Sequence, residues 1–576
     1  MKRFRRHNRA EQLTFRDNSV IAKMIRFFFW AVVIWFIGVF IFWPLIQTVR
    51  LAVFDNGKIR ENLGSMLFNA QNMEALGNTV LLGFLTVIVC GAVGSFFAFY
   101  TTMVRPRGHR ILHSFLFLPF VLPGVISVLA FIQIYADTGV INQSLKALFK
   151  LDSAPFQFVG LPAILVIHAA TQYVIFYLQM RLAFQSIDLY QVEAAKQLGA
   201  SNFTVFKDVF WPELKPYVLT ASLLTFVSGI SAFSAPYLVG GRFTVMSSRI
   251  AASKVNNDLV SARLQVLILF GLSAILMIIY QLVKKNTAQD RIAKSSRRGK
   301  LLIRSRKVRG TLHTVTWLLL LYIFGPLLSL IMFSFGKTSE WMTKIMPTTF
   351  TLENYERLFG AKRAFRPLAN SLKMSLIAAV VVCVLSVIFL TISDRRKGPL
   401  SQLGRFGYTL PAAMPVSTLG IMLISAFNIP NPLIGNQILV GTFYIMPLAY
   451  AIIALPTGFR TVQSAFEQFP ADLAYAAADL GASARRILFD IRLPMARPAI
   501  ITTFLYVFMR SLGEYNISAL LFNLKTEPIS IRMISSMHDY NMGLSMAYAT
   551  IILTMSLVIS FTTNYLETKR IRRVSR

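Results

Sequence analysis

The sequence has little charge, and acidic residues are especially scarce. Charged residues make up 15% of the 576 positions, whereas about a quarter is usual in soluble globular proteins. Asp and Glu number 25 against 59 Lys and Arg, and 55% of the residues are hydrophobic. A chain this apolar is predicted to be a membrane protein. The net charge of +34 does not indicate nucleic acid as a partner, because the basic residues lie in short clusters between apolar runs.

Cysteine and phosphate-binding glycine loops are also nearly absent. The two cysteines, Cys90 and Cys383, each lie inside an apolar run, so they are predicted to be small buried hydrophobic residues rather than disulfide partners or metal ligands. The sequence Gly336-Lys337-Thr338 has Ile331 where a P-loop requires its first glycine. We therefore predict no catalytic residues for ATP hydrolysis, no cofactor and no tight metal site.

Long apolar runs are what the sequence does contain. A bilayer core of about 30 Å needs roughly 20 apolar residues of helix, with every backbone polar group paired inside the protein. The run 406–459 is too long for one span, and the turn-forming sequence NIPNPLIGN (Asn428–Asn436) divides it. We predict an all-α polytopic membrane protein with about twelve transmembrane helices. They are expected within Phe27–Val49, Ala75–Val104, Ile111–Ala136, Ser153–Met180, Pro216–Gly241, Leu264–Val283, Gly310–Gly336, Met374–Ser393, Phe406–Phe459, Pro498–Leu524 and Met542–Leu566.

Basic residues orient these helices. With a cytoplasmic N-terminus, the segments that face the cytoplasm carry 40 of the 59 Lys and Arg residues, which is the positive-inside bias. Segment 337–373 is predicted outside although it holds seven basic residues. Both termini are expected in the cytoplasm. The predicted organisation is a basic N-terminal segment 1–26, a first transmembrane half 27–283, a basic linker 284–309, a second transmembrane half 310–566 and a basic tail 567–576.

The two halves share an internal repeat. VEAAKQLGAS (Val192–Ser201) returns as AYAAADLGAS (Ala474–Ser483), and one constant offset aligns 191–216 with 473–498 without a gap. Nine of these 26 positions are identical. Six predicted spans belong to each half, and both halves begin on the cytoplasmic side. The repeat is therefore predicted to be parallel, with its axis along the membrane normal.

Each copy is predicted to form two short helices outside the bilayer, between the fourth and fifth spans of its half. Gly199 follows a run of helix formers, and glycine accommodates the left-handed backbone at a helix end. Ser201 is predicted to cap the next helix, and Pro212 to end the segment. A connector that packs only on its own bundle would explain one copy. Two copies at equivalent positions favour a docking element, whose alanine face lets another protein approach.

These residues resemble the EAA motif of the permease subunits of bacterial ABC importers. That motif has the form E-A-A, three residues, Gly, nine residues and then I-x-L-P, and the repeated six-span pattern extends the resemblance over nearly the whole chain. The resemblance implies the type I importer permease fold and loops 191–216 and 473–498 as coupling loops. The residues expected to carry coupling are Glu193, Ala194, Ala195, Gly199 and Pro212 in the first half, with Ala476, Ala477, Asp479, Gly481 and Pro494 in the second.

In that family the EAA helix fits a cleft on an ATPase subunit and passes on its closure. The resemblance therefore implies two copies of a cytoplasmic ABC ATPase as partners of a permease that is not itself an enzyme. Tyr475 stands where the second motif has Glu, so the two halves are expected to couple unequally.

A secondary transporter of the major facilitator type is the alternative, because it also has two parallel six-span halves. SDRRKG (Ser393–Gly398) is similar to a loop of that superfamily, but its glycine is misplaced, and VRPRGHR (Val104–Arg110) in the first half lacks the Asp. This alternative leaves the repeated loops unexplained.

Polar groups inside the predicted spans are candidates for a translocation path. Arg510 and Glu514 are four residues apart, as on one helix face, and an unpaired charge at mid-bilayer costs about 2.5–3.5 kcal/mol. They are predicted to form either an internal ion pair or part of a water-lined path. His168 and Gln172 on the fourth span are the second candidate, although a hydrogen-bonded packing histidine is the favoured interpretation.

Two further segments indicate the cargo. FSAPYLVGGRF (Phe233–Phe243) and SLGEYNIS (Ser511–Ser518), in two fused halves, most resemble the iron(III) permease group. Permeases for thiamine, aminoethylphosphonate, phosphosugars, polyamines and sulfate share much of this pattern. The resemblance favours ferric iron, and it implies an extracytoplasmic substrate-binding protein and a location in the bacterial cytoplasmic membrane.

Overall fold

The computed structural model describes residues 20–286, 305–340, 344–393 and 398–574. Within these ranges the protein consists of helices, together with one antiparallel hairpin of β1 (Phe54–Asp55) and β2 (Lys58–Ile59) and two isolated β-bridges. The predicted all-α fold is confirmed. Parts of the predicted basic segments 1–26, 284–309 and 567–576, and of the sequence 393–398, lie outside the described residues.

The helices of the first half are α2 (Val20–Ile37), η1 (Gly38–Phe42), α3 (Trp43–Val53), α4 (Leu63–Leu67), α5 (Ala70–Phe99), η2 (Tyr100–Val104), α6 (His109–Val121), α7 (Gly124–Tyr135), α8 (Val140–Phe149), α9 (Gly160–Thr171), α10 (Tyr173–Ser186), α11 (Leu189–Gln197), α12 (Asn202–Val205), η3 (Phe206–Phe210), α13 (Trp211–Ile230), α14 (Ser234–Val239), α15 (Met246–Val255) and α16 (Leu259–Asn286). Those of the second half are α17 (Arg306–Ser334), η5 (Thr338–Glu340), α18 (Glu353–Gly360), α19 (Lys362–Ile392), α20 (Pro399–Thr409), η6 (Leu410–Ala413), α21 (Val416–Phe427), η7 (Pro432–Ile434), α22 (Ile445–Glu467), α23 (Ala471–Asp479), α24 (Ala484–Arg486), η8 (Ile487–Arg492), α25 (Leu493–Leu512), α26 (Ser518–Leu521), α27 (Ile529–His538) and α28 (Met542–Val574).

The predicted spans coincide with helices. In the described part of the chain, eight helical stretches are long and apolar enough to cross a membrane, or ten if each of two bent helix pairs is one span. The bent pairs are α9 with α10, at 44°, and α20–η6 with α21, at 116°. The two remaining predicted spans correspond to α13 and α25, whose first turns are less apolar because they carry prolines and charged residues.

Prolines break a helix at equivalent places in the two halves. Leu118-Pro119 is followed by Pro123, and Leu410-Pro411 by Pro415. Proline has no N–H to donate and disfavours helix at the residue before it. A new helix starts directly after each second proline, α7 in the first half and α21 in the second. The apolar run 111–136, predicted as one span, is therefore divided.

Each half is built around the same three helices. In the first half α5, α10 and α13 pack against one another, and in the second half α19, α22 and α25 do so. Glycine permits the close approach of two of them. A Cβ atom at Gly94 of α5 would lie 2.7 Å from the carbonyl oxygen of Tyr173, and one at Gly458 of α22 would lie 2.5 Å from Cγ1 of Val382 on α19.

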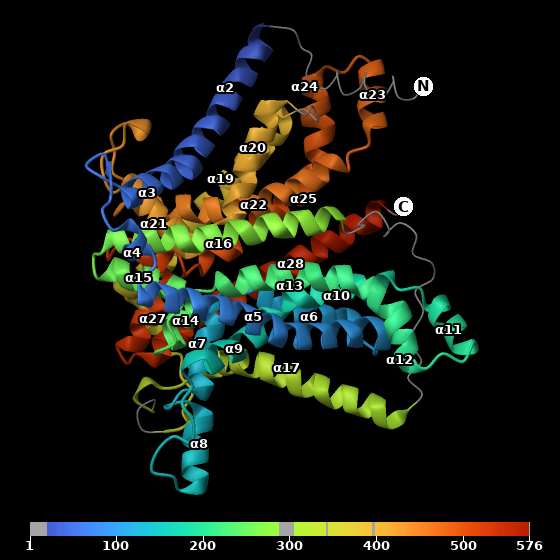
Figure 1. The fold of residues 1–576 in the computed structure, drawn as a ribbon, viewed down its shortest axis with the longest axis vertical. Helices are drawn as coiled ribbons and strands as arrows, with labels where there is room; N and C mark the ends of the chain where they lie inside the picture. The colour runs from blue at the N-terminus through green and yellow to red at the C-terminus, as the bar shows by residue number, and fades with distance from the viewer. Residues whose placement is uncertain (1–19, 287–304, 341–343, 394–397, 575–576) are drawn as a thin grey trace.

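The first helices of each half pack on the other half. α2 contacts α19 and α20, and α3 contacts α21, whereas α17 of the second half contacts α7 and α9. In Figure 1, α11 and α12 lie at the right, α23 and α24 lie at the top, and α4, α15 and α27 lie at the left. The two halves are thus interlocked, and both repeated loops lie away from α4, α15 and α27.

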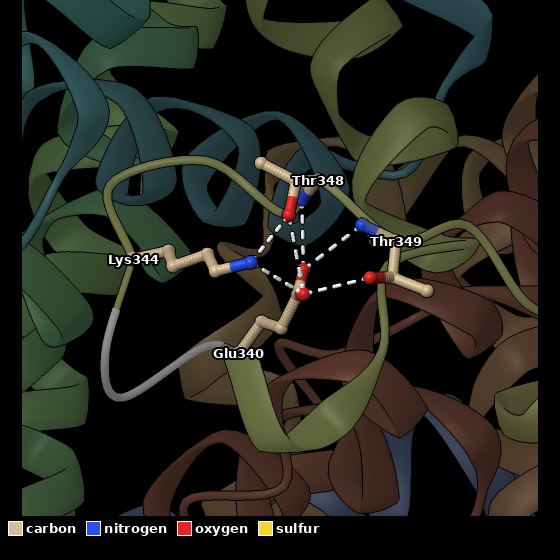
Figure 2. A network of polar contacts seen from close by, with 4 residues as sticks. All are labelled: Glu340, Lys344, Thr348 and Thr349. Atoms are coloured by element: carbon tan, nitrogen blue, oxygen red, sulfur yellow. Dashed lines mark hydrogen bonds and ion pairs between the residues drawn. The ribbon is translucent and has the colours of Figure 1, made fainter.

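A buried carboxylate organises the segment that follows α17 (Figure 2). Oε2 of Glu340 accepts the backbone N–H groups of Thr348 at 2.7 Å and Thr349 at 3.0 Å, and Oε1 accepts the Thr349 hydroxyl at 2.8 Å. The Lys344 ammonium donates to Oε1 at 2.7 Å and also to the Thr348 hydroxyl. This ammonium, together with the N–H and hydroxyl of Thr349, holds the pKa of Glu340 well below its usual range.

Replacing Glu340 with Gln should loosen the segment between η5 and α18. The amide loses the charge-assisted contact with Lys344 and accepts the remaining hydrogen bonds more weakly. We expect faster proteolytic cleavage within 337–352 of the purified variant at neutral pH. In the wild type the lowered pKa keeps the carboxylate charged, so its contribution is lost only as the pH falls through the folded-state pKa. Protection should therefore persist at about pH 4, close to the pKa of an unperturbed Glu.

Glu353→Gln is the matched control, because Glu353 pairs with Arg357 on the more exposed α18, and such pairs contribute little. It should leave cleavage unchanged. Equal protection of Glu340→Gln and wild type at neutral pH would contradict the assigned role of Glu340.

Candidate functional site

The first repeated loop is a helix, a left-handed turn and a second helix. The Asp188 side chain caps α11 by accepting the N–H of Tyr190 at 3.0 Å. The helix ends in a turn in which the N–H of Ala200 donates to the carbonyl of Ala195 at 3.0 Å. Gly199 within this turn has φ +82°, a conformation that glycine adopts at little cost.

Ser201 then caps the next helix, as the sequence predicts. Its hydroxyl accepts the N–H of Thr204 at 3.1 Å. From there the chain is helical through α12 and the π-helix η3 into α13, and Pro212 stands in the first turn of α13 rather than at a helix end. The loop is therefore joined to a long helix of the bundle by continuous helical backbone.

The second repeated loop has the same geometry. Gly481 also has φ +82°, and the N–H of Ala482 donates to the carbonyl of Ala477 at 2.9 Å. The π-helix η8 follows α24 and leads into α25, with Pro494 in its first turn. The backbone thus repeats in the register that the sequence alignment of the two loops predicts. The π-helices were not predicted, because no sequence pattern that we used distinguishes them from α-helix.

Both turns present their tips to the surrounding space. Leu198 and Leu480 occupy equivalent positions, and each is 89% exposed. Beyond the adjoining residues, no atom of the described part of the chain lies within 4 Å of a Cβ built on Gly199 or Gly481. Leu198 and Leu480 thus form a matched pair of exposed apolar side chains, one beside each left-handed turn.

The other predicted loop residues flank these tips. Ala195 and Ala477 are half-buried, and the remaining ones are exposed, namely Glu193, Ala194 and Pro212 in the first half, and Ala476, Asp479 and Pro494 in the second. The two surfaces differ chemically. Half-buried Tyr475 takes the place of Glu193, and exposed Arg485 takes the place of Phe203, which is 75% exposed.

His168 is placed as a packing residue. It is 2% exposed, and its Nδ1 lies 2.9 Å from the hydroxyl of Thr86 on α5. Gln172 is not on the same helix, because it stands at the bend between α9 and α10, where its N–H donates to the His168 carbonyl at 2.8 Å. In the described part of the chain no hydrogen bond joins these two side chains.

Arg510 and Glu514 are also separated by a helix end. Arg510 lies in the last turn of α25, which ends at Leu512, and Glu514 belongs to the following turn. The two form none of the four ion pairs found among the described residues. The Glu514 carboxylate instead accepts the backbone N–H groups of Asn516 at 2.8 Å and Ile517 at 3.3 Å.

The sequence analysis missed a contact between the halves next to these charges. The rings of Phe233 and Tyr515 lie 6.2 Å apart, centroid to centroid. The alignment that pairs the repeated loops also pairs these two residues, so the signal was available. A contact between equivalent residues marks the place where the pseudo-twofold axis passes between the halves. In the described residues no group of three or more His, Cys, Asp or Glu could hold a metal ion.

Comparisons with known proteins agree with this repeated architecture. Residues 90–289 and 384–572 each match the family "Binding-protein-dependent transport system inner membrane component". A probable ABC transporter permease protein, y4fN of Sinorhizobium fredii, is 30% identical over 552 residues, covering 93% of this chain and 96% of the relative. The ferric transport system permease protein FbpB of Actinobacillus pleuropneumoniae is 23% identical, and the alignment covers 90% of this chain and 75% of FbpB. The sulfate transport system permease protein CysT of Salmonella typhimurium is 30% identical, but the alignment covers 35% of this chain and 77% of CysT.

If His168 serves packing, its partner on α5 should matter for stability. Thr86→Val keeps the shape of the side chain but leaves Nδ1 of the buried His168 without this partner, which should cost about 1–3 kcal/mol. We expect a lower apparent melting temperature of the purified protein. Thr102→Val is the matched control, because the buried hydroxyl of Thr102 has no hydrogen-bond partner among the described residues, and it should be neutral or stabilising. Equal melting temperatures for wild type and Thr86→Val would argue against the packing role.

Proposed function

We propose how this chain, as an ABC importer permease, couples to ATP hydrolysis and which cargo it carries. The chain belongs to the family of binding-protein-dependent transport system inner membrane components. Membership of this family sets aside the major facilitator alternative. We propose that the two repeated loops dock two copies of a cytoplasmic ABC ATPase. The linker and both termini would then also face the cytoplasm, and a substrate-binding protein would deliver the cargo from the other side of the cytoplasmic membrane.

The observation that carries the docking proposal is the pair of exposed leucines held on identical left-handed turns. Two identical ATPase subunits require two equivalent docking points, and Gly199 and Gly481 support them with the same backbone geometry. The continuous backbone from α12 through η3 to α13, and from α24 through η8 to α25, would carry ATPase motion into the bundle. α13 and α25 end next to Phe233 and Tyr515, where the halves meet, so movement of the loops would separate or close the halves.

The docking proposal is tested by replacing both Gly199 and Gly481 with Val. A β-branched residue at φ +82° costs on the order of 1–2 kcal/mol, so each turn must rearrange and displace its leucine. We expect the double variant to insert into the membrane but to lose co-purification with its co-expressed ATPase and to lose ATP-dependent uptake.

Asn at both positions is the matched control, because Asn tolerates the left-handed conformation, and it should retain most of the coupling. A second test changes Leu198 and Leu480 to Asp, which leaves the backbone unstrained and should also weaken ATPase binding. Uptake at the wild-type level by the valine double variant would contradict the docking role.

Ferric iron is the cargo that the comparisons support best. The relative named for ferric transport aligns with 90% of this chain, through both halves, whereas the sulfate permease aligns with 35%. Permeases named for trehalose/maltose and 2-aminoethylphosphonate align with 41% and 43%. Permeases for phosphosugars, thiamine and polyamines are further alternatives from the sequence resemblance.

Uptake of radiolabelled ferric iron by cells that express the complete transporter tests this proposal. We expect accumulation that depends on this chain and on ATP, and that excess sulfate, 2-aminoethylphosphonate, thiamine or putrescine does not suppress. Cells carrying the Gly199→Val, Gly481→Val double variant are the negative control. Suppression by one of these competitors, with no chain-dependent iron uptake, would reassign the cargo.

A further inference from the structure

Arg510 is an exposed arginine at the end of one of the helices that form the second half of the bundle. It stands in the last turn of α25, which packs against α19, α22 and α28. The side chain is exposed, although the helix that carries it packs against three others. Charged residues within a membrane almost always face the bundle interior or a water-filled space, and not the lipid.

The guanidinium has spare hydrogen-bonding capacity. One of its nitrogens, Nη1, donates to the hydroxyl of Tyr506 at 3.3 Å. No carboxylate of a described residue lies within 4.0 Å of it, since Arg510 is in none of the four ion pairs. Glu514, the nearby carboxylate along the chain, attracts the guanidinium electrostatically without forming an ion pair with it, and it accepts the N–H groups of Asn516 and Ile517. Arginine carries five N–H donors, so several remain for a ligand.

The position of Arg510 is next to the pseudo-twofold axis. A Cβ atom at Gly513, three residues on, would lie 2.3 Å from Cγ of Pro123 in the first half. Tyr515 meets its equivalent Phe233 across the axis. The end of α25 that carries Arg510 therefore abuts the first half, at the interface that must open for a cargo to pass.

The positions of the first half that align with this arginine and with Glu514 are uncharged. The alignment of the two halves relates Arg510 to Ser228 and Glu514 to Ala232. An arginine within the membrane costs about 2.5–3.5 kcal/mol when unpaired. The described residues do not offset this cost with an ion pair, although a carboxylate at position 228 or 232 would have been the simple way to do so.

We propose that Arg510, together with the Tyr506 hydroxyl, contacts an anionic oxygen group of the cargo as it passes between the halves. This inference rests on the proposed importer function and narrows its cargo. Arginine binds carboxylate, phosphate and sulfate oxygens with charge-assisted, often bidentate hydrogen bonds. It repels a bare ferric ion, a polyamine or thiamine. A ferric cargo therefore passes as a complex whose oxyanion ligands face Arg510.

Binding to the purified full-length chain in nanodiscs of uncharged lipid tests the site without lipid headgroups as competing anions. The probes are citrate, ferric citrate, inorganic phosphate and sulfate, with putrescine as the cationic probe, measured by calorimetry. We expect at least one oxyanion probe to bind. Arg510→Gln should lower the affinity for that oxyanion about tenfold or more, since a charged hydrogen bond contributes about 1.5–3 kcal/mol. Arg510→Lys should retain part of the affinity, and Tyr506→Phe should lose less than Arg510→Gln.

The matched control is Arg357→Gln, which removes an arginine paired with Glu353 on α18 and should leave binding unchanged. Melting temperatures identify a variant that fails to fold. If Arg510→Gln does not fold, the oxyanion affinity of Tyr506→Phe is compared with that of wild type instead. The proposal is overturned if no oxyanion probe binds the wild type at concentrations on the order of 10 mM. It is also overturned if Arg510→Gln binds the oxyanions as well as wild type, or if putrescine binds in their place.

These outcomes are separable from the failure of the proposed function. Oxyanion binding through Arg510 without any ferric uptake would keep the anion contact and remove iron as the cargo. ATP-dependent ferric uptake at the wild-type rate by Arg510→Gln would keep the importer and remove the anion contact. The ratio of ferric citrate to citrate affinity shows whether the metal or only its ligand is recognised.

Discussion

The structure depends on one requirement, that every backbone polar group within the hydrocarbon layer is paired inside the protein. Long helices pair their backbone polar groups internally, whereas the breaks at Pro123 and Pro415 leave some of these groups without a partner in the helix. Both breaks are followed by fully buried helix, since residues 125–131 of α7 and 417–427 of α21 are buried. The exchange of first helices between the halves helps to cover them, because α17 packs on α7 and α3 packs on α21. The interlocked halves are thus a consequence of placing broken helices at the centre.

This arrangement also explains why the loops can act on the centre of the molecule. The helical backbone runs without interruption from Asn202, shortly after the turn at Gly199, to Ile230, and from Ala484, shortly after Gly481, to Leu512. The breaks lie on the neighbouring segments that end at Pro123 and Pro415. A force at either loop is therefore transmitted along α13 or α25 to their far ends, while the broken helices provide the surfaces against which these ends move. Gly513 joins the two kinds of element, because it lies so near Pro123 that a side chain at position 513 would clash with the proline ring.

Much of this was predictable from the sequence, because strong local signals carry it. Apolar runs long enough to cross a bilayer located the helices, the ungapped alignment of the two loops found the repeat, and Gly199 with Ser201 indicated the turn and its cap. The breaks at Pro123 and at Gln172 were missed because an apolar run does not reveal whether its helix is continuous. The helix end between Arg510 and Glu514 was missed for the same reason, since spacing by four places two residues on one face only if the helix reaches both.

What differs between the halves is chemistry, and what they share is backbone geometry. The conformations at Gly199 and Gly481, the prolines that follow and the packing of three helices are repeated because both halves must meet the same steric demands. Tyr475 in place of Glu193, and Arg510 in place of Ser228, change neither a turn nor a helix, so the fold does not oppose them. Cargo on a twofold axis meets both halves at once, and a single arginine there is enough to favour an anionic group. Fusing the halves in one chain permits this asymmetry, because two copies of one subunit would carry an arginine from each half.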